Sequence, residues 1–160
     1  LYNVPGRTGA NLEAATTLRL AQIDNVIGIK EASSNRGQIL EIIEGRPEGF
    51  LVLSGNDDET FPLMKAGADG VISVASNIAP EPVAKLTHAM MEGKVEKAAG
   101  LHEMLSPLFR NCFVESNPIP AKAALAAMGM MCNELRLPLV ASQQKTYDLM
   151  VETIKDLKLL

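Results

Sequence analysis

Residues 26–32, VIGIKEA, form the short stretch around which the rest of the chain is organised. Its first four residues are apolar or glycine, and it lies between Asn25 and the polar run SSN at residues 33–35. A short apolar run with turn-forming residues at both ends is typical of a strand that is buried on both faces. The run ends in Lys30, and a lysine is rarely buried without a partner or a chemical role.

Two interpretations of Lys30 follow from this position. If the amine is partly desolvated where a buried strand emerges, desolvation favours its neutral form. A neutral amine is a nucleophile for a ketone, which is how lysines form Schiff bases. In the alternative interpretation, Lys30 is only the last residue of the strand, turned towards solvent and paired with Glu31. The stretch by itself leaves both interpretations open.

The remainder of the first half alternates between apolar strands and amphipathic helices. Three of the helices are introduced by a residue that can act as an N-cap, namely Asn11, Asn35 or Thr60. The helix of 57–66 carries Pro62, which is tolerated in a first turn. Strands are expected at 1–4, 26–30, 50–53 and 70–74, and helices at 11–22, 35–45, 57–66 and 80–92. Strictly alternating βα units with apolar strands predict a parallel sheet covered by helices.

Such an α/β pattern is met in doubly wound open sheets and in (β/α)8 barrels. No G-x-G-x-x-G follows any strand and the chain holds no Walker A sequence, so nothing in it supports nucleotide binding. Beyond Gly93 the pattern becomes helical, with helices expected at 94–110, from 118 to about 129, and from Ser142 onwards.

Composition and charge exclude several classes of function. Of the 160 residues, 47% are hydrophobic and 21% are charged, as in ordinary globular proteins, and the net charge of −4 argues against a general nucleic-acid surface. No apolar run reaches membrane-spanning length and no signal peptide is evident, so a cytoplasmic enzyme is expected. Cys112 and Cys132 are too far apart for a CxxC motif, and nothing near His88 or His102 completes a set of metal ligands.

The first residues have the pattern of the end of a strand. Leu1 is not an initiator methionine, and the segment LYNVP at residues 1–5 reads as a strand whose beginning is missing. We therefore expect a fragment, a processed chain or one half of a split protein.

Several motifs, taken together, resemble the dihydrodipicolinate synthase family. They are YNVPGRTG at 2–9, GIKEA at 28–32, LSG at 53–55, GVISV at 70–74, NPIP at 117–120 and LRLP at 135–138. They occur in the family's order and at similar spacing over essentially the whole chain. The resemblance implies the C-terminal half of a (β/α)8 TIM barrel, from the end of strand 5 to helix 8 in residues 1–93, followed by a helical C-terminal extension in residues 94–160.

The resemblance also implies a lyase of the diaminopimelate route to lysine, which condenses pyruvate with L-aspartate 4-semialdehyde. Lys30 matches the lysine that forms the imine with pyruvate, and Tyr2 matches the tyrosine that donates and accepts protons. Arg7 matches the arginine that holds the carboxylate of the aldehyde substrate. Ile72 matches a strand position whose backbone carbonyl faces the pyruvate adduct, while its side chain is expected in the core. Because the imine is itself the electron sink, no metal or nucleotide cofactor is implied.

The family's first half contributes a threonine pair for the pyruvate carboxylate and a second tyrosine borrowed across a dimer interface. This chain lacks both, so we expect it to need an N-terminal half-barrel or another copy to close the sheet, within a homo-oligomer. Two alternatives remain. One is a related pyruvate-dependent aldolase such as N-acetylneuraminate lyase, against which Arg7 followed by Thr8 and Gly9 argues. The other is a non-catalytic half-barrel that serves as a structural or assembly piece.

Overall fold

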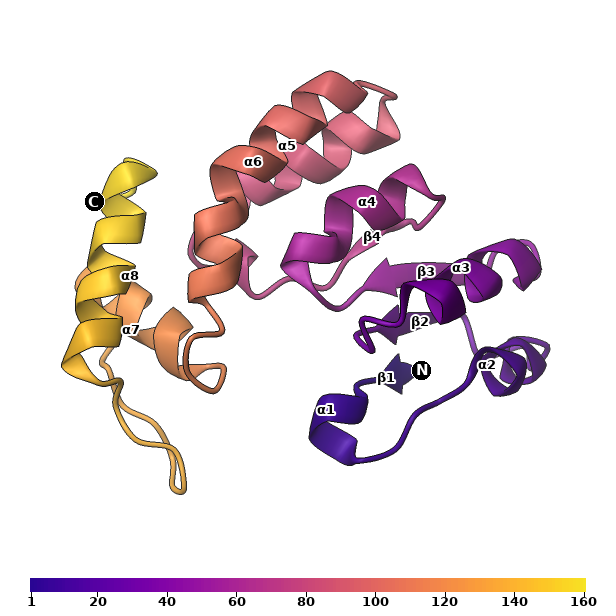
Figure 1. Ribbon diagram of the computed structural model, residues 1–160, viewed down its shortest axis with the longest axis horizontal. Coiled ribbons are helices and arrows are strands. Elements are labelled where there is room, and N and C mark those ends of the chain that lie inside the picture. The colour runs from indigo at the N-terminus through magenta and orange to yellow at the C-terminus, as the bar shows by residue number, and fades with distance from the viewer. The chain divides into compact units, whose positions relative to one another are not determined.

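Four short strands pair in parallel and in chain order, β1-β2-β3-β4. The computed structural model describes residues 1–160, and Figure 1 shows the four strands side by side. Their bounds are Tyr2–Asn3 for β1, Gly28–Glu31 for β2, Leu51–Ser54 for β3 and Gly70–Val71 for β4. The parallel sheet with helical connections that the sequence predicts is therefore present.

Helices follow each of these strands. The connection after β1 holds the single turn α1 (Pro5–Thr8) and then α2 (Ala14–Leu20). The helix α3 (Arg36–Gly45) follows β2, and the 3-10 turn η1 (Asp57–Glu59) leads from β3 into α4 (Thr60–Lys65). Contacts between Cα atoms divide the chain into two compact units, Leu1–Ser73 and Val74–Leu160, and the sheet with these helices makes up the first.

The register of the sheet assigns each side chain to one of two faces. Tyr2 is opposite Lys30, and Lys30 is opposite Leu53, so these three side chains share one face. Asn3 is opposite Glu31, which is opposite Ser54, and their side chains share the other face. A shift of one residue in either strand would exchange the two sets, so the pairing of β1 with β2 decides which groups meet Lys30.

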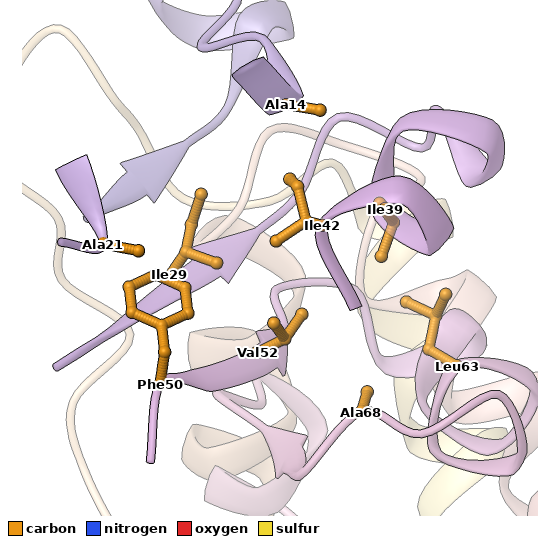
Figure 2. Packing of buried hydrophobic residues seen from close by; sticks show 9 residues of the cluster. All are labelled: Ala14, Ala21, Ile29, Ile39, Ile42, Phe50, Val52, Leu63 and Ala68. Atoms are coloured by element: carbon orange, nitrogen blue, oxygen red, sulfur yellow. The ribbon is translucent and has the colours of Figure 1, made fainter. Parts of the chain in front are cut away.

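The second face is covered by helices and forms the core of the first unit. Figure 2 shows the buried cluster, in which Ile29 and Val52 of the sheet meet Ile39 and Ile42 of α3. The remaining members come from the segments before and after the strands and from α2 and α4; they are Ala14, Ala21, Phe50, Leu63 and Ala68. Ile39 and Ile42 have no exposed surface, as expected for the apolar stripe of an amphipathic helix.

The second unit consists of helices. Its elements are the 3-10 turn η2 (Ala75–Asn77), α5 (Pro80–Met91), α6 (Val95–Asn111), α7 (Ile119–Ala127) and α8 (Gln144–Asp156). Helix α5 packs along α6, and α8 contacts both α6 and α7 (Figure 1). Leu86, Leu105, Met150 and Ile154 are buried here. No helix of the chain is both long enough and apolar enough to cross a membrane.

Several boundaries differ from those that the sequence predicts. Asn11 does not cap α2, which begins after Glu13, because the Asn11 side chain binds Asn3 and Gln38 instead. The strand expected at 70–74 ends at Val71, because its partner β3 ends at Ser54, opposite Val71.

The last helix also starts later than expected. The Gln143 carbonyl accepts hydrogen bonds from the backbone N–H groups of Thr146 and Tyr147, each at 3.0 Å. Gln143 is therefore the N-cap of α8, in place of Ser142.

The N-caps expected for two other helices have different outcomes. Asn35 does cap α3, since its side chain accepts from the Gln38 N–H at 3.2 Å, whereas Thr60 is the first residue of α4 and not its cap.

Candidate active site

Lys30 and Tyr2 meet at the carboxyl ends of two neighbouring strands. They are directly opposite each other in the pairing of β2 with β1, and the Lys30 Nζ lies 4.3 Å from the centroid of the Tyr2 ring. Lys30 is partly buried, and Tyr2 is 50% exposed. At this distance the lysine head group is in contact with the aromatic face. The sheet register thus places the amine against the phenol ring on a face that ligands can approach.

The position of these two side chains rests on backbone pairing between β1 and β2. The Lys30 N–H donates to the Leu1 carbonyl at 3.0 Å, and the Ala32 N–H donates to the Asn3 carbonyl at 2.9 Å. These hydrogen bonds flank the Tyr2–Lys30 pair on both sides. They hold the two Cα atoms opposite each other in the sheet.

Arg7 lies on the single turn α1, directly after β1. The N–H groups of Arg7 and Thr8 both donate to the Val4 carbonyl, at 2.9 and 3.2 Å, which folds the chain back immediately after the strand. The Arg7 side chain is exposed, and none of the three ion pairs of the chain involves it. The turn falls between the strand expected at 1–4 and the helix expected at 11–22, where the sequence predicts no helix. The guanidinium is free to bind an external carboxylate.

Ile72 lies directly after β4. Its N–H donates to the Ser54 carbonyl at 2.8 Å, which continues the pairing of β3 with β4 by one residue. Its side chain is 46% exposed, so the expectation that it lies in the core is wrong. The reason is that β4 is an edge strand of this four-stranded sheet, and Ile72 follows it on the face that carries Lys30 and Leu53.

The residues around Gly55 leave no room for a side chain at this position, which lies beside Lys30. A Cβ at position 55 would lie 2.6 Å from the Ala32 Cβ, 3.1 Å from the Glu31 carbonyl oxygen and 3.1 Å from the Lys30 Cε. The Gly55 N–H also donates to the Glu31 carbonyl at 2.7 Å, so the backbone after β3 is held close to the end of β2. A side chain here would press directly on the lysine stem or on the strand that carries it.

Glu31 does not pair with Lys30. Its carboxylate lies on the opposite face of the sheet, where it is completely buried and accepts hydrogen bonds from Asn3, Ser33 and Gln38. The alternative in which Lys30 is a strand-end lysine neutralised by its neighbour is therefore wrong about the pairing. The amine keeps its hydrogen-bonding capacity for a ligand.

All four residues that the sequence singles out lie at the carboxyl ends of strands or immediately after them. Parallel α/β sheets bind their ligands at this edge. The structure brings Lys30 and Tyr2 into contact, and it places Arg7 and Ile72 after β1 and β4, the two outer strands. An amine beside a phenol, with a free guanidinium on the next turn, can add to a carbonyl, move protons and bind a carboxylate.

Sequence reasoning did not identify Gly55, Asn3 or Gln38 as part of this region. A signal for Gly55 was present, because a glycine directly after an apolar strand often marks a close approach of two backbones. A signal for Asn3 was present as well. The pairs Tyr2–Asn3 and Lys30–Glu31 both place a polar residue on the opposite face from a candidate catalytic one.

Comparison with known proteins identifies the family. The model of the dihydrodipicolinate synthetase family matches residues 1–157. The 4-hydroxy-tetrahydrodipicolinate synthase of Thermotoga neapolitana is 48% identical over 164 residues, which cover 100% of this chain and 56% of that protein. The crystal structure of dihydrodipicolinate synthase from Thermotoga maritima superposes with a TM-score of 0.97 at 48% identity, over 99% of this chain and 55% of the other.

A third relative has been solved with a ligand. The chloride-inhibited dihydrodipicolinate synthase of Acinetobacter baumannii, in complex with pyruvate, superposes with a TM-score of 0.96 at 37% identity, over 100% of this chain and 55% of that one. The chain therefore spans about half the length of the relatives it matches, and its α/β sheet with C-terminal helices corresponds to their C-terminal part. On the family model and on these identities, the chain belongs to the dihydrodipicolinate synthetase family.

Proposed function

We propose that this chain supplies the Schiff-base lysine of a lyase that condenses pyruvate with L-aspartate 4-semialdehyde, on the diaminopimelate route to lysine. The observation that carries the proposal is the contact between the Lys30 Nζ and the Tyr2 ring, at 4.3 Å on adjacent strand ends. The names of the relatives and the family model support the same reaction.

Lys30 is the nucleophile in this proposal. Its neutral amine attacks the ketone carbon of pyruvate to give a carbinolamine, which loses water to form an imine. The protonated imine is an electron sink, so the neighbouring methyl carbon gives up a proton and an enamine forms. The enamine carbon then adds to the aldehyde of the second substrate, and that substrate's own amine displaces the lysine as the ring closes.

Tyr2 moves protons in these steps. The carbinolamine must gain a proton on its hydroxyl before water leaves, and a phenol beside the amine can donate that proton and later take one back. The half-exposed ring supports this role, because a proton relay needs a route to solvent. The proposal needs neither a metal ion nor a nucleotide, since the imine itself stabilises the carbanion.

Arg7 and Ile72 bind substrate in this proposal. A free guanidinium on an exposed turn suits the carboxylate of the aldehyde substrate, because its planar fork can donate two parallel hydrogen bonds. The Ile72 backbone lies at the end of β4 on the Lys30 face, and its carbonyl would accept a hydrogen bond from the pyruvate adduct.

Two further features of the proposal concern organisation. The barrel portion would comprise residues 1–93 and the helical extension residues 94–160. The strands β1 and β4 are the outer strands of the sheet. In the assembled enzyme they would pair with further strands, from an N-terminal half-barrel or from another copy in a homo-oligomer, and so close the barrel.

The experiment that tests the function is covalent trapping in the assembled enzyme. Pyruvate followed by borohydride should add one reduced pyruvate adduct, and peptide mapping should locate it on Lys30. Lys30→Arg should abolish the adduct while the fold is kept, because a guanidinium is not a nucleophile near neutral pH. An adduct on another lysine, or none in the wild type, would sink the assignment and favour a non-catalytic half-barrel.

A further inference from the structure

A buried carboxylate lies directly behind the candidate active site. Glu31 follows Lys30 in β2, has no exposed surface, and lies on the face of the sheet opposite the lysine. No lysine or arginine pairs with it. A buried charge without a counter-ion costs stability unless hydrogen bonds replace the lost water. The contacts of this carboxylate therefore indicate what it does.

Every partner of Glu31 is a nitrogen donor. The Asn3 Nδ2 lies 3.2 and 3.1 Å from its two oxygens, the Ser33 backbone N–H donates to Oε1 at 2.8 Å, and the Gln38 Nε2 donates to Oε2 at 3.2 Å. An ionised carboxylate only accepts hydrogen bonds, so it fits a site lined by donors. These donors come from β1, from the turn after β2 and from α3. One carboxylate thus joins three separate segments.

The side-chain amides of Asn3 and Gln38 cannot flip to present their oxygens to residue 31. The Asn3 Oδ1 accepts from the Leu12 N–H at 2.9 Å, so its amide nitrogen must face Glu31. The Gln38 Nε2 also donates to the Leu12 backbone carbonyl at 3.2 Å, and because a carbonyl only accepts, this contact fixes the Gln38 amide in the same way. Because both orientations are fixed by other contacts, only a group with two accepting oxygens satisfies the site at residue 31.

This network also reaches the segment that carries Arg7. The Asn3 side chain holds Leu12 through the hydrogen bond to its N–H, and it donates to the Asn11 Oδ1 at 2.9 Å. Asn11 and Leu12 end the connection that begins with α1. The connection is therefore attached at one end to β1 through its backbone and at the other end to Glu31 through Asn3.

We propose that Glu31 is a positioning residue: through Asn3 it holds Tyr2 in register with Lys30, and through Asn3 and Leu12 it anchors the Arg7 segment. The role rests on the function proposed above. Glu31 touches no substrate, and it acts from the far face of the sheet. A loosened strand end would let the amine and the phenol drift apart, and a displacement of about 1 Å at reacting groups can cost on the order of a hundredfold in rate.

The test replaces the carboxylate by an amide of the same shape in the assembled enzyme. In Glu31→Gln, one accepting oxygen becomes an NH2 group that faces the N–H donors of Asn3, Ser33 or Gln38. We expect the rate of imine formation at saturating pyruvate, followed by borohydride trapping, to fall about ten- to a hundredfold. The adduct should still form on Lys30.

A matched control separates positioning from stability. Asp69 precedes β4, accepts from the Val52 N–H at 2.8 Å and pairs with Arg46, so Asp69→Asn makes the same chemical change at the other end of the strands. It should lower the unfolding temperature and leave the trapping rate unchanged. If Glu31→Gln at a matched loss of stability traps pyruvate as fast as the wild type, Glu31 is only structural and the proposal is wrong.

Two further variants complete the test. The double change Glu31→Gln with Gln38→Glu returns a carboxylate to the pair and should recover part of the trapping rate, whereas no recovery would count against the network. Should Glu31→Gln fail to fold, Gln38→Met leaves the carboxylate in place, removes the Gln38 donor to Glu31 together with the contacts of Gln38 to Asn11 and Leu12, and should slow trapping in the same direction. If the wild type forms no adduct on Lys30, the proposed function fails. A wild-type adduct with an unaffected Glu31→Gln rejects only the positioning role.

Discussion

The Lys30 Nζ lies 4.3 Å from the centroid of the Tyr2 ring, and the two residues are directly opposite each other in the parallel pairing of β2 with β1. The register of these two short strands determines which residue lies beside Lys30. A shift by one residue would put Asn3 beside the lysine and remove the phenol. The chemistry proposed for Lys30 therefore depends on how firmly β1 is held.

Tyr2→Phe removes the hydroxyl and keeps the aromatic ring, so it tests the two parts of the side chain separately. The aromatic face beneath the Lys30 amine stays, so the position of the amine should be preserved, while the hydroxyl of the proposed proton relay is lost. We expect Lys30 to be trapped by borohydride still, and turnover to fall by about 10²- to 10⁴-fold, which is the usual contribution of a general acid–base group. Steady-state rates measured beside trapping yields check this. Turnover that matches the wild type would show that Tyr2 acts only through its ring.

Arg7→Ala should affect the two substrates differently. The Arg7 guanidinium is exposed and makes no ion pair within the chain, so its removal leaves no buried charge behind. A charge-assisted hydrogen bond contributes about 1.5 to 3 kcal/mol, or roughly ten- to a hundredfold in affinity. We expect the KM for aspartate 4-semialdehyde to rise by that factor and the KM for pyruvate to stay nearly constant.

Arg19→Ala is the control for this prediction. Arg19 lies in the last turn of α2 and is exposed, so its loss changes the net charge in the same way without touching the strand ends. It should leave both Michaelis constants unchanged. Equal rises in both constants for Arg7→Ala would argue that α1 has a general structural role and that Arg7 does not recognise the second substrate.

The sequence predicted some elements closely, for identifiable physical reasons. Asn35 caps α3 as expected, and Ile39 and Ile42 are buried, because a local capping hydrogen bond and a helical apolar stripe are both set by neighbours along the chain. Asn11 was predicted wrongly as a cap, because its side chain is engaged by Asn3 and Gln38. Which of two hydrogen bonds an asparagine makes depends on tertiary neighbours that local sequence does not reveal.

In the candidate site, too, some features could be predicted from the sequence and others depend on tertiary neighbours. The apolar run before Lys30 and the family motifs were enough to single out Lys30, Tyr2, Arg7 and Ile72. The role of Glu31 could not be read in this way, because a glutamate beside a lysine suggests an ion pair, and only the alternation of the strand sends the two side chains to opposite faces. Gly55 requires the register of β3 against β2 before its crowding becomes visible.

Gly55→Ala should impair catalysis through steric pressure on the lysine. The new methyl would lie 2.6 Å from the Ala32 Cβ and 3.1 Å from the Lys30 Cε, and contacts this short force a neighbour to move. Overpacking of this kind costs about 1 to 3 kcal/mol. We expect a lower unfolding temperature together with slower pyruvate trapping, both measured on the assembled enzyme.

Gly37→Ala provides the comparison. Gly37 lies inside α3, where an added Cβ would meet only the Asn35 Oδ1, at 3.7 Å. Alanine is a better helix former than glycine by about 0.5 to 1 kcal/mol, so this variant should be slightly more stable and equally active. If Gly55→Ala trapped pyruvate at the wild-type rate, the prediction that the added methyl group displaces the Lys30 side chain would be wrong.

The last prediction concerns the isolated 160-residue chain. In its sheet, β1 pairs only with β2 and β4 only with β3, so both outer strands present unpaired backbone groups. The Lys30 face also carries half-exposed apolar side chains, with Leu51 at 42% and Ile72 at 46%. Open edges beside exposed apolar strands favour association with other chains. We therefore expect the isolated chain to self-associate or aggregate in sedimentation velocity, and to lack turnover with both substrates. A stable monomer that condenses pyruvate with aspartate 4-semialdehyde would contradict the expectation that the sheet must be closed by further strands.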